Sequence, residues 1–427
     1  MKKFSGAFFI FGIFYFLKMN RIQSNPNFEN ILLMGTMFIG AYLLALALKK
    51  AKLPKLTGFM ITGFILGPNV LHFLSHENLE GLKFFENFAL AFIAITAGGE
   101  LKFSRIKKVL KPVLFILFNQ IFLVYFLLLI ILIPLAQVFL KGFLANQNYL
   151  IGFAILFAAA ALSKSPATTM GIISELKAKG RLTDIVLSVT VLKSIFVVLV
   201  FPFIITYAKI FLIENFTFDF GQVIALGKQV LGSLALGGLF GILIILFLKY
   251  VRMESMIFLF LTGVVITEVS HIFGLEILIT SIVTGIVVEN FSEKGEELIE
   301  GIKKTSLPLY IVFFTFAGAS LHVDTLRKAI AMTALLVILR MILLYLSNFL
   351  AGYLLKEDKI IKHYSWLGFI GQAGIAVGLA NIIEAAIPGE IGMIFKSILI
   401  ATVVINEFLG PIFFKFLLVK SGEAQTE

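Results

Sequence analysis

The sequence predicts an all-α, polytopic membrane protein with about fourteen transmembrane helices, and three observations lead to this fold class. Apolar residues make up 59% of the 427 residues, whereas charged residues make up only 14%. Soluble domains carry roughly 25% charged residues because their surfaces need polar cover. The apolar residues form long uninterrupted runs, which indicate helices rather than the alternating strands of a membrane barrel. A soluble enzyme, a nuclear protein and a disordered chain are therefore excluded.

Runs of about 20 apolar residues, the length that a membrane helix needs, define the predicted spans. They are 4–18, 29–49, 55–72, 82–101, 112–140, 148–176, 184–208, 222–249, 254–271, 275–290, 305–321, 327–355, 363–386 and 391–419. Residues 1–28 are expected to hold an extra helix and loop, 29–420 the membrane domain and 421–427 a cytoplasmic tail. The span 4–18 is alternatively a cleaved signal peptide, but no small-residue cleavage pattern follows it.

Loop charge supports this map. One set of alternate loops carries twenty-one lysines and arginines, and the other set carries seven. Cytoplasmic loops are the lysine- and arginine-rich ones, so both termini are predicted to be cytoplasmic. The same asymmetry explains the net charge of +11 without a nucleic-acid partner.

Several kinds of site are not expected. The chain has no cysteine and only five histidines, so disulfides, thiolate sites and histidine-rich metal sites are not predicted. It has no phosphate-binding loop and no zinc-protease motif, and the connections between spans are short. We therefore expect no enzyme activity and no cofactor. An ion gradient, a membrane potential or the substrate's own gradient must drive any transport.

Two spans are interrupted near their middles. In the first, Pro166 breaks the helical hydrogen bonding among hydroxyl residues that include Ser163, Ser165 and Thr168. In the second, glycines flank Gln372. Irregular backbone at membrane depth is tolerated only where it is buried or lines a cavity, and such pairs mark transporter sites. The alternative is ordinary helix packing through small residues.

Ionisable groups within the bilayer are costly and usually functional. Lys193 lies about 14 Å along span 184–208, with Thr190 and Ser194 beside it, and Arg340 is similarly central in span 327–355. Two carboxylates are candidate supporting charges: Glu100 and Glu268. The alternative role for Lys193, Arg340 and Glu268 is internal salt bridging between helices, and the alternative for Glu100 is an ordinary residue at a helix end.

Several segments, in this order, resemble the monovalent cation:proton antiporter superfamily, the sodium/proton exchanger-like membrane domain, from about Asn30 to Lys420. The segments are Leu53–Pro68, Ala97–Leu101, Ser165–Thr169 with Glu175–Leu176 and Gly180–Thr183, Glu268 with Thr284–Gly285, Phe313–Gly318 and Gly371–Gly374. The resemblance implies a thirteen-helix inverted-repeat fold plus one extra helix, with the two interrupted helices crossing. It further implies a homodimer with a scaffold and a moving core (about 82–208 and 305–419), which exchanges sodium or potassium for protons by an elevator-like motion. The expected setting is a bacterial-type inner (plasma) membrane.

One departure from the family pattern concerns the expected ion site. The family carries an Asp-Asp or Asn-Asp pair on the helix after the broken one, where this chain has Lys193-Ser194. Arg340 matches a basic residue that the family keeps, so two basic groups and no acid are expected at the site. Because burial disfavours a charged amine, one hypothesis makes Lys193 the proton carrier. The alternatives are an anion or organic solute transporter using Lys193 and Arg340, and a non-transporting sensor or scaffold.

Overall fold

The computed structural model describes residues 12, 26–50, 53–68, 70–139, 147–213, 220–251, 255–319, 330–372, 374–387 and 389–425. Every regular element within these ranges is helical, which is the predicted class. The predicted span 4–18 lies outside the described residues, apart from residue 12.

Each predicted span from 29–49 onward falls on a helical segment. These segments are α2 (Pro26–Lys50), α3 (Lys55–Leu66), α5 (Lys83–Gly99), α6 (Phe103–Asn119) continued by the π-helical η1 (Gln120–Val124) and α7 (Tyr125–Phe139), α8 (Gln147–Ala161) with α9 (Pro166–Leu176), α10 (Arg181–Leu212), α11 (Phe220–Tyr250), α12 (Ser255–Ile272), α13 (Ile277–Phe291), α15 (Leu307–Ala319), α17 (Ile330–Leu354), the 3-10 helix η2 (Ser365–Phe369) with α19 (Gly374–Ala386), and α20 (Glu390–Lys420). Three short helices in the connections were not expected: α4 (His76–Gly81), α14 (Gly295–Thr305) and α18 (Lys359–Tyr364). In the described part of the chain, six helical segments are long and apolar enough to cross a membrane by themselves.

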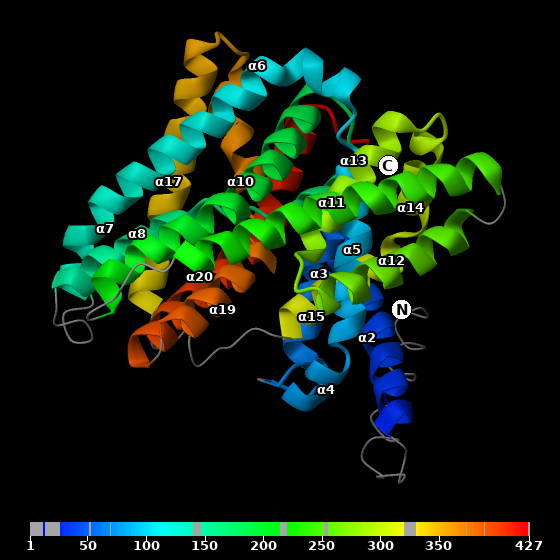
Figure 1. Ribbon diagram of the computed structural model, residues 1–427, viewed down its shortest axis with the longest axis horizontal. Helices are drawn as coiled ribbons and strands as arrows, with labels where there is room; N and C mark the ends of the chain where they lie inside the picture. The colour runs from blue at the N-terminus through cyan, green and yellow to red at the C-terminus, as the bar shows by residue number, and fades with distance from the viewer. Residues whose placement is uncertain are drawn as a thin grey trace.

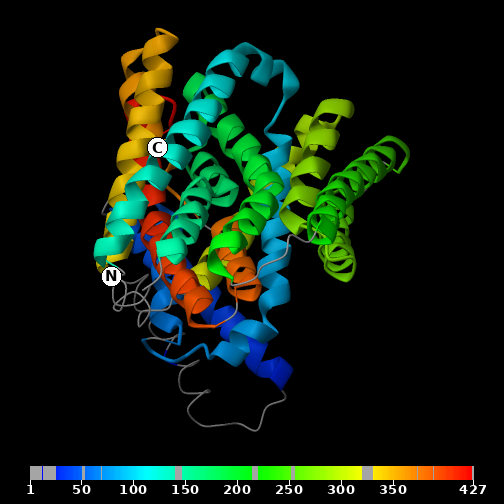
Figure 2. The ribbon, with the colours of Figure 1, turned by 60° about the vertical axis from the view of Figure 1, so that its left-hand side comes forward.

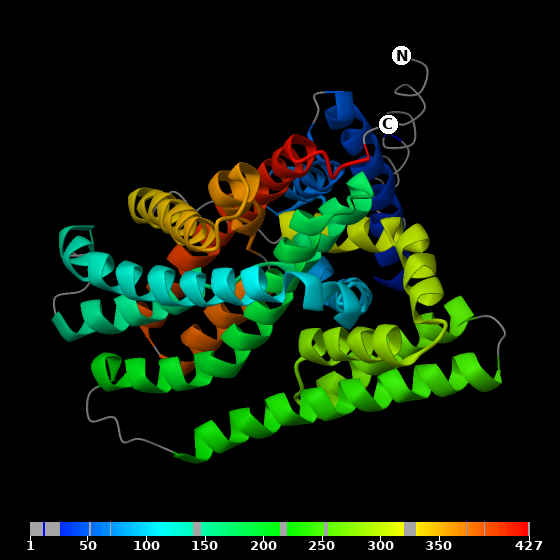
Figure 3. The ribbon, with the colours of Figure 1, turned by 90° about the horizontal axis from the view of Figure 1, so that it is seen from above.

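The helices pack as two groups that lie side by side (Figures 1 and 3). We call α2, α3, α5 and α11–α15 the scaffold group, because α13 packs on α5 and α11, and α3 packs on α2 and α15. We call α6–α10 and α17–α20 the crossing group, because α8 and α6 pack on α10, and α17 packs on α6 and α20. Figure 3 shows α11 along one edge of the scaffold group.

Reciprocal glycines hold the scaffold helices in close contact. Gly63 and Gly318 face each other's helices in the α3–α15 pair, and Gly98 and Gly285 do so in the α5–α13 pair. A Cβ atom at any of these four positions would lie no more than 2.0 Å from a carbonyl oxygen of the facing helix. Small residues allow membrane helices to approach this closely and to gain backbone van der Waals contact.

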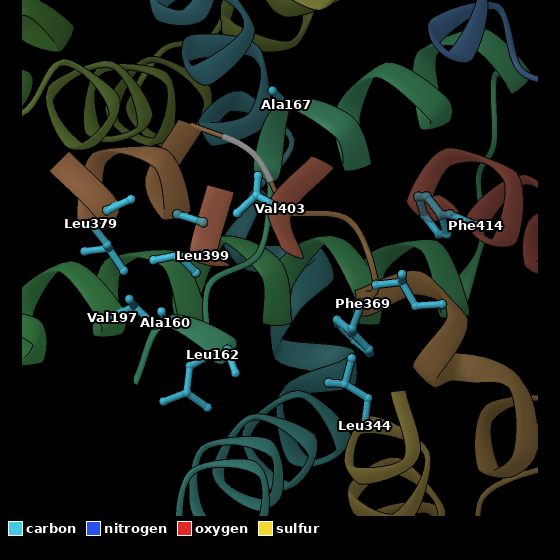
Figure 4. Packing of buried hydrophobic residues seen from close by; sticks show 14 of the residues in the cluster. Ala160, Leu162, Ala167, Val197, Leu344, Phe369, Leu379, Leu399, Val403 and Phe414 are labelled. Atoms are coloured by element: carbon cyan, nitrogen blue, oxygen red, sulfur yellow. The ribbon is translucent and has the colours of Figure 1, made fainter. Parts of the chain in front are cut away.

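Both interrupted helices lie in the crossing group, inside a shell of buried apolar side chains (Figure 4). Ala160 and Leu162 lie where α8 ends at the first interruption, and Phe369 precedes the second; all three are buried. This packing leaves the irregular backbone shielded from lipid and water.

The glycine contacts predict that Gly98→Ala destabilises the protein by about 1–3 kcal/mol, the range of overpacked cores, because its methyl group meets a backbone carbonyl that cannot rotate away. The measurement is the thermal unfolding midpoint of the purified protein in detergent. Gly238→Ala in α11 is the matched control, since no atom lies within 4 Å of its added Cβ. Equal midpoints for the two variants would contradict the close-packing role.

Candidate functional site

The first interruption separates α8 from α9. The backbone of Leu162 and Ser163 turns back onto the last turn of α8 through two short-range hydrogen bonds, 3.1 and 3.0 Å long. Pro166 then starts α9, a position that suits proline because its missing N–H would have no partner there. The Ser165 hydroxyl caps α9 by accepting from the backbone N–H of Thr168. Lys164 therefore lies outside the regular helix, between the two half-helices, and is only 1% exposed.

The second interruption, between η2 and α19, touches the first directly. The backbone N–H of Ser165 donates to the carbonyl of Gly371 at 3.2 Å. On its other side Gly371 meets Gly410 of α20, where an added Cβ would lie 2.5 Å from the Gly371 Cα. The two breaks and α20 thus come together at one point, as expected for crossing interrupted helices.

Arg340 binds both breaks. Its guanidinium donates to Ala161 and Ser163 of the first break, at 2.8 and 3.1 Å, and to Phe369 and Ile370 of the second, at 3.1 and 2.7 Å. Carbonyls at a helix C-terminus lack backbone partners and carry partial negative charge. Arg340 therefore satisfies the ends of two half-helices, and four carbonyl oxygens occupy its donors.

A buried carboxylate also lies at the crossing, which corrects the expectation that the site holds no acid. Glu407 of α20 is 3% exposed and accepts a hydrogen bond from the Thr168 hydroxyl. Among the described residues, its Oε2 has no hydrogen-bond partner. This oxygen and the Lys164 Nζ lie 3.5 and 3.4 Å from the position that a Cβ at Gly371 would occupy. Lys164 and Glu407 therefore face each other across Gly371.

An amide chain lines the same crossing. Asn406 donates to the Gln372 side-chain carbonyl at 2.8 Å, and Gln372 donates to the Ser163 hydroxyl at 2.9 Å and to the Ala160 carbonyl at 3.1 Å. A small cavity of about 10 Å³ adjoins Gln372 and Arg340, close to the smallest volume that admits one water. In this conformation the crossing is sealed from solvent.

Lys193 is a fully buried residue of α10 and lies next to the first break. Its Nζ donates to the side-chain carbonyl of Gln120 at 2.8 Å. Gln120 begins η1, and π-helical segments of this kind are frequent at functional sites. The neighbouring Ser194 hydroxyl donates to the Thr190 carbonyl at 2.8 Å and lies 3.2 Å from the Lys164 carbonyl. The lysine is therefore anchored by a neutral amide beside the break.

The predicted site residues consequently divide into two sets. Those that the structure brings to the crossing are Ser163, Ser165, Pro166, Thr168, Thr190, Lys193, Ser194, Arg340 and Gln372. The two candidate supporting carboxylates are not among them. Glu268 is exposed on α12, in the scaffold group, and Glu100 ends α5.

Near Glu100, ion pairs connect the start of α6 to both α13 and α14. Lys102 lies 2.7 Å from Glu296 and 3.4 Å from Glu289. The hydrogen bond to Lys102 lowers the pKa of the Glu296 carboxyl, and the same bond raises the pKa of Lys102. These partly exposed pairs belong to the surface at the helix ends and not to the crossing.

Four residues at the crossing were missed from the sequence: Gln120, Lys164, Asn406 and Glu407. The signal for Glu407 is its place well inside span 391–419, four residues before Pro411, which cannot donate to the Glu407 carbonyl. The signal for Lys164 is that it lies within the interrupted Ser-Lys-Ser-Pro segment itself. No sequence signal distinguishes Gln120 from other polar residues in the spans, because a π-helical segment has no simple sequence pattern.

Comparison with known proteins agrees with this architecture. The family profile described as "Sodium/hydrogen exchanger, transmembrane" matches residues 34–420. A relative from Methanocaldococcus jannaschii, "Probable Na(+)/H(+) antiporter 3", is 26% identical over an alignment of 393 residues, and the match covers 87% of this chain and 92% of the relative.

Two solved structures of the sodium proton antiporter MjNhaP1 from Methanocaldococcus jannaschii share the fold. The structure at pH 8 has a TM-score of 0.65 and 16% identity, and it covers 93% of this chain and 99% of that chain. The electron-microscopy structure has a TM-score of 0.66 and 18% identity, with coverage of 92% and 98%. The predicted all-α antiporter fold is thus confirmed.

The four carbonyl contacts predict that Arg340→Gln destabilises the protein by about 3–5 kcal/mol, because it leaves buried backbone carbonyls without donors, at about 1–3 kcal/mol each. Arg340→Lys is expected to recover only part of this, since an ammonium cannot span both breaks. The measurement is thermal unfolding in detergent, and the control is Arg105→Gln, which removes only a partly exposed ion pair with Glu296. Full stability of Arg340→Gln would overturn the structural role of this guanidinium.

Proposed function

This chain belongs to the sodium/hydrogen exchanger family, and on that premise we propose that it exchanges a monovalent cation, sodium or potassium, for protons at the crossing of its two interrupted helices. It is a transport protein and not an enzyme. The observation that carries the proposal is the fully enclosed Glu407 carboxylate, which faces Lys164 across the meeting point of the two breaks.

The charges at the crossing support cation binding. The guanidinium of Arg340 stays charged but is stabilised by four carbonyl oxygens, so the ionisable groups left to take part in exchange are Lys164, Lys193 and Glu407. Hard cations prefer oxygen ligands, and the Glu407 carboxylate, the Thr168 hydroxyl and nearby carbonyls are such ligands. A cation at Glu407 takes the place of the Lys164 ammonium as the carboxylate's electrostatic partner.

This competition provides a route to proton coupling. When a cation binds Glu407, the facing ammonium of Lys164 loses its compensating charge within a dry interior. A buried lysine in that position is favoured in its neutral form, so a proton leaves as the cation enters. The sequence predicts Lys193 as the proton carrier. The geometry favours Lys164 instead, because Lys193 donates a hydrogen bond to Gln120 and not to a carboxylate. In our proposal Lys193 is the second amine of the same site.

We further propose that the crossing group moves against the scaffold group, as in an elevator. Polar contacts between the groups gather at one end of the bundle. The Glu175 carboxylate of α9 accepts from the Lys55 N–H at the start of α3, at 2.9 and 3.0 Å. Lys415 of α20 donates to the Leu53 carbonyl at 3.3 Å. These contacts would have to break for the crossing to open at that end.

The packing suggests narrower core boundaries than those expected from the sequence. It supports α6–α10 and α17–α20 as the moving unit, with α5 and α15 assigned to the scaffold. A homodimer, cytoplasmic termini and a bacterial-type inner membrane complete the proposal. The lysine-rich loops support this orientation.

Glu407→Gln is predicted to lower cation-driven proton movement about a hundredfold, the equivalent of roughly 3 kcal/mol of charged interaction. The assay is dissipation of an imposed pH gradient in proteoliposomes on addition of sodium, potassium or lithium. The control is Glu297→Gln, an exposed carboxylate on α14. Lys164→Met should abolish exchange, and Lys193→Met should leave measurable exchange.

If Lys193→Met abolishes exchange and Lys164→Met does not, the proton carrier is Lys193. Full activity of Glu407→Gln would reject the cation site. If no cation collapses the gradient but an anion does, the surplus of buried amines has an anion-binding role instead. If neither a cation nor an anion collapses the gradient, the protein is a non-transporting sensor or scaffold protein of the same fold.

Glu175→Gln is predicted to open the crossing toward the Lys55 end, because a neutral amide caps the α3 N-terminus less well than a carboxylate. We expect about a fivefold gain in accessibility, corresponding to a cap of about 1 kcal/mol. The chain has no cysteine, so a cysteine in place of buried Leu56, which contacts Gly171 across the group boundary, reports accessibility through its maleimide labelling rate. The same cysteine in the Glu297→Gln background is the control. An unchanged labelling rate in Glu175→Gln would show that this contact does not keep the crossing closed.

A further inference from the structure

An open groove on the outer face of the crossing group has no part in the transport site. It has a volume of about 630 Å³ and lies between α17, the α18–η2 segment and the last turns of α20. Aromatic and aliphatic side chains line it, among them Tyr345, Trp366, Leu367, Phe413 and Phe416. Figure 2 shows α17 (gold) and the end of α20 (red) next to each other at one edge of the molecule.

The groove runs from the helix ends toward the middle of the bundle. Tyr345 lies nine residues before Leu354, the last residue of α17, which corresponds to about 14 Å along a helix. Exposed apolar residues, including Ile338 and Ile342, continue the same face of α17. Since half of the hydrocarbon core is roughly 15 Å thick, the groove reaches from the bilayer interface well into the hydrocarbon.

The mouth of the groove is basic. The Lys420 ammonium lies 4.5 Å from the ring centre of Tyr364 and 5.6 Å from that of Phe416, and both rings line the groove. His363 lines the groove as well, and Lys362 precedes it on α18.

The nearby acids are engaged elsewhere. Glu357 pairs with Arg181 at 2.5 and 2.8 Å, and Asp358 caps α18. The Glu423 carboxylate accepts from the backbone at the start of α10, at 2.8 and 2.7 Å. None of these three carboxylates is therefore paired with the cationic groups at the mouth of the groove.

We propose that this groove binds a phospholipid with a negatively charged headgroup, its acyl chain lying against the aromatic lining and its phosphate beside Lys420. Basic pockets between helices at the cytoplasmic side of membrane proteins suit such headgroups, and aromatic rings suit the interface level. The inference goes beyond the proposed exchange activity and does not depend on it.

The chain's single tryptophan gives a direct test, because Trp366 lines the groove. The full-length protein is reconstituted with phosphatidylglycerol or phosphatidylcholine carrying brominated acyl chains, and quenching of indole fluorescence is measured against lipid mole fraction. We expect brominated phosphatidylglycerol to displace unlabelled phosphatidylcholine with about a fivefold preference, the contribution of one lysine near an anionic lipid. Lys420→Gln should abolish the preference, and Lys420→Arg should keep it.

Lys249→Gln is the matched control, since Lys249 also lies at a helix end over a tyrosine ring, 5.6 Å from the centre of Tyr250. It should retain the preference, and unchanged thermal unfolding of each variant excludes a folding defect. Equal quenching by the two lipids would overturn the proposal, as would a preference that survives Lys420→Gln. Absence of quenching by either lipid would mean that the groove is covered by protein, which overturns it too. None of these readouts requires transport, so failure here is distinct from failure of the exchange proposal.

Discussion

The crossing depends on one guanidinium. Two half-helices that end in the middle of a membrane protein present carbonyl groups that neither water nor lipid can satisfy. Arg340 donates to two carbonyls at each break, and so joins the segments around Ala161 and Phe369 into one structure. The positive charge and the partial negative charges of the helix ends compensate each other, which is why an arginine can be buried there.

Because Arg340 donates its hydrogen bonds to backbone carbonyls, our proposal assigns ion and proton binding to the side chains around it. Lys164 and Glu407 approach the same point beside Gly371, since the Lys164 Nζ and the Glu407 Oε2 lie 3.4 and 3.5 Å from the place that a Cβ there would occupy. Glu407 comes from α20, far along the chain from the first break, and Lys193 comes from α10. The helix after the first break therefore carries Lys193-Ser194 at the crossing, and the buried acid described there comes from α20.

The two helix groups are held in different ways. Within the scaffold group, reciprocal glycines let backbones touch, as between Gly98 and the helix of Gly285. Between the groups, the polar contacts described here are hydrogen bonds and ion pairs, such as those of Glu175 with the first turn of α3 and of Lys102 with Glu296. Partly exposed contacts of this kind resist displacement less than close backbone packing does, and this difference supports our proposal of a rigid scaffold beside a mobile unit.

The amino-acid sequence by itself determined the helical membrane class, the approximate spans and both interruptions, because apolar run length and a proline among hydroxyls are local signals. It also singled out Lys193 and Arg340, which are unusual at membrane depth. Only the tertiary structure decided that Glu407 is the acid at the crossing, that Glu268 is exposed elsewhere and that Gln120 binds Lys193. The physical reason is that a buried charge is defined by the partners that folding brings to it, and these partners come from helices far apart in the chain.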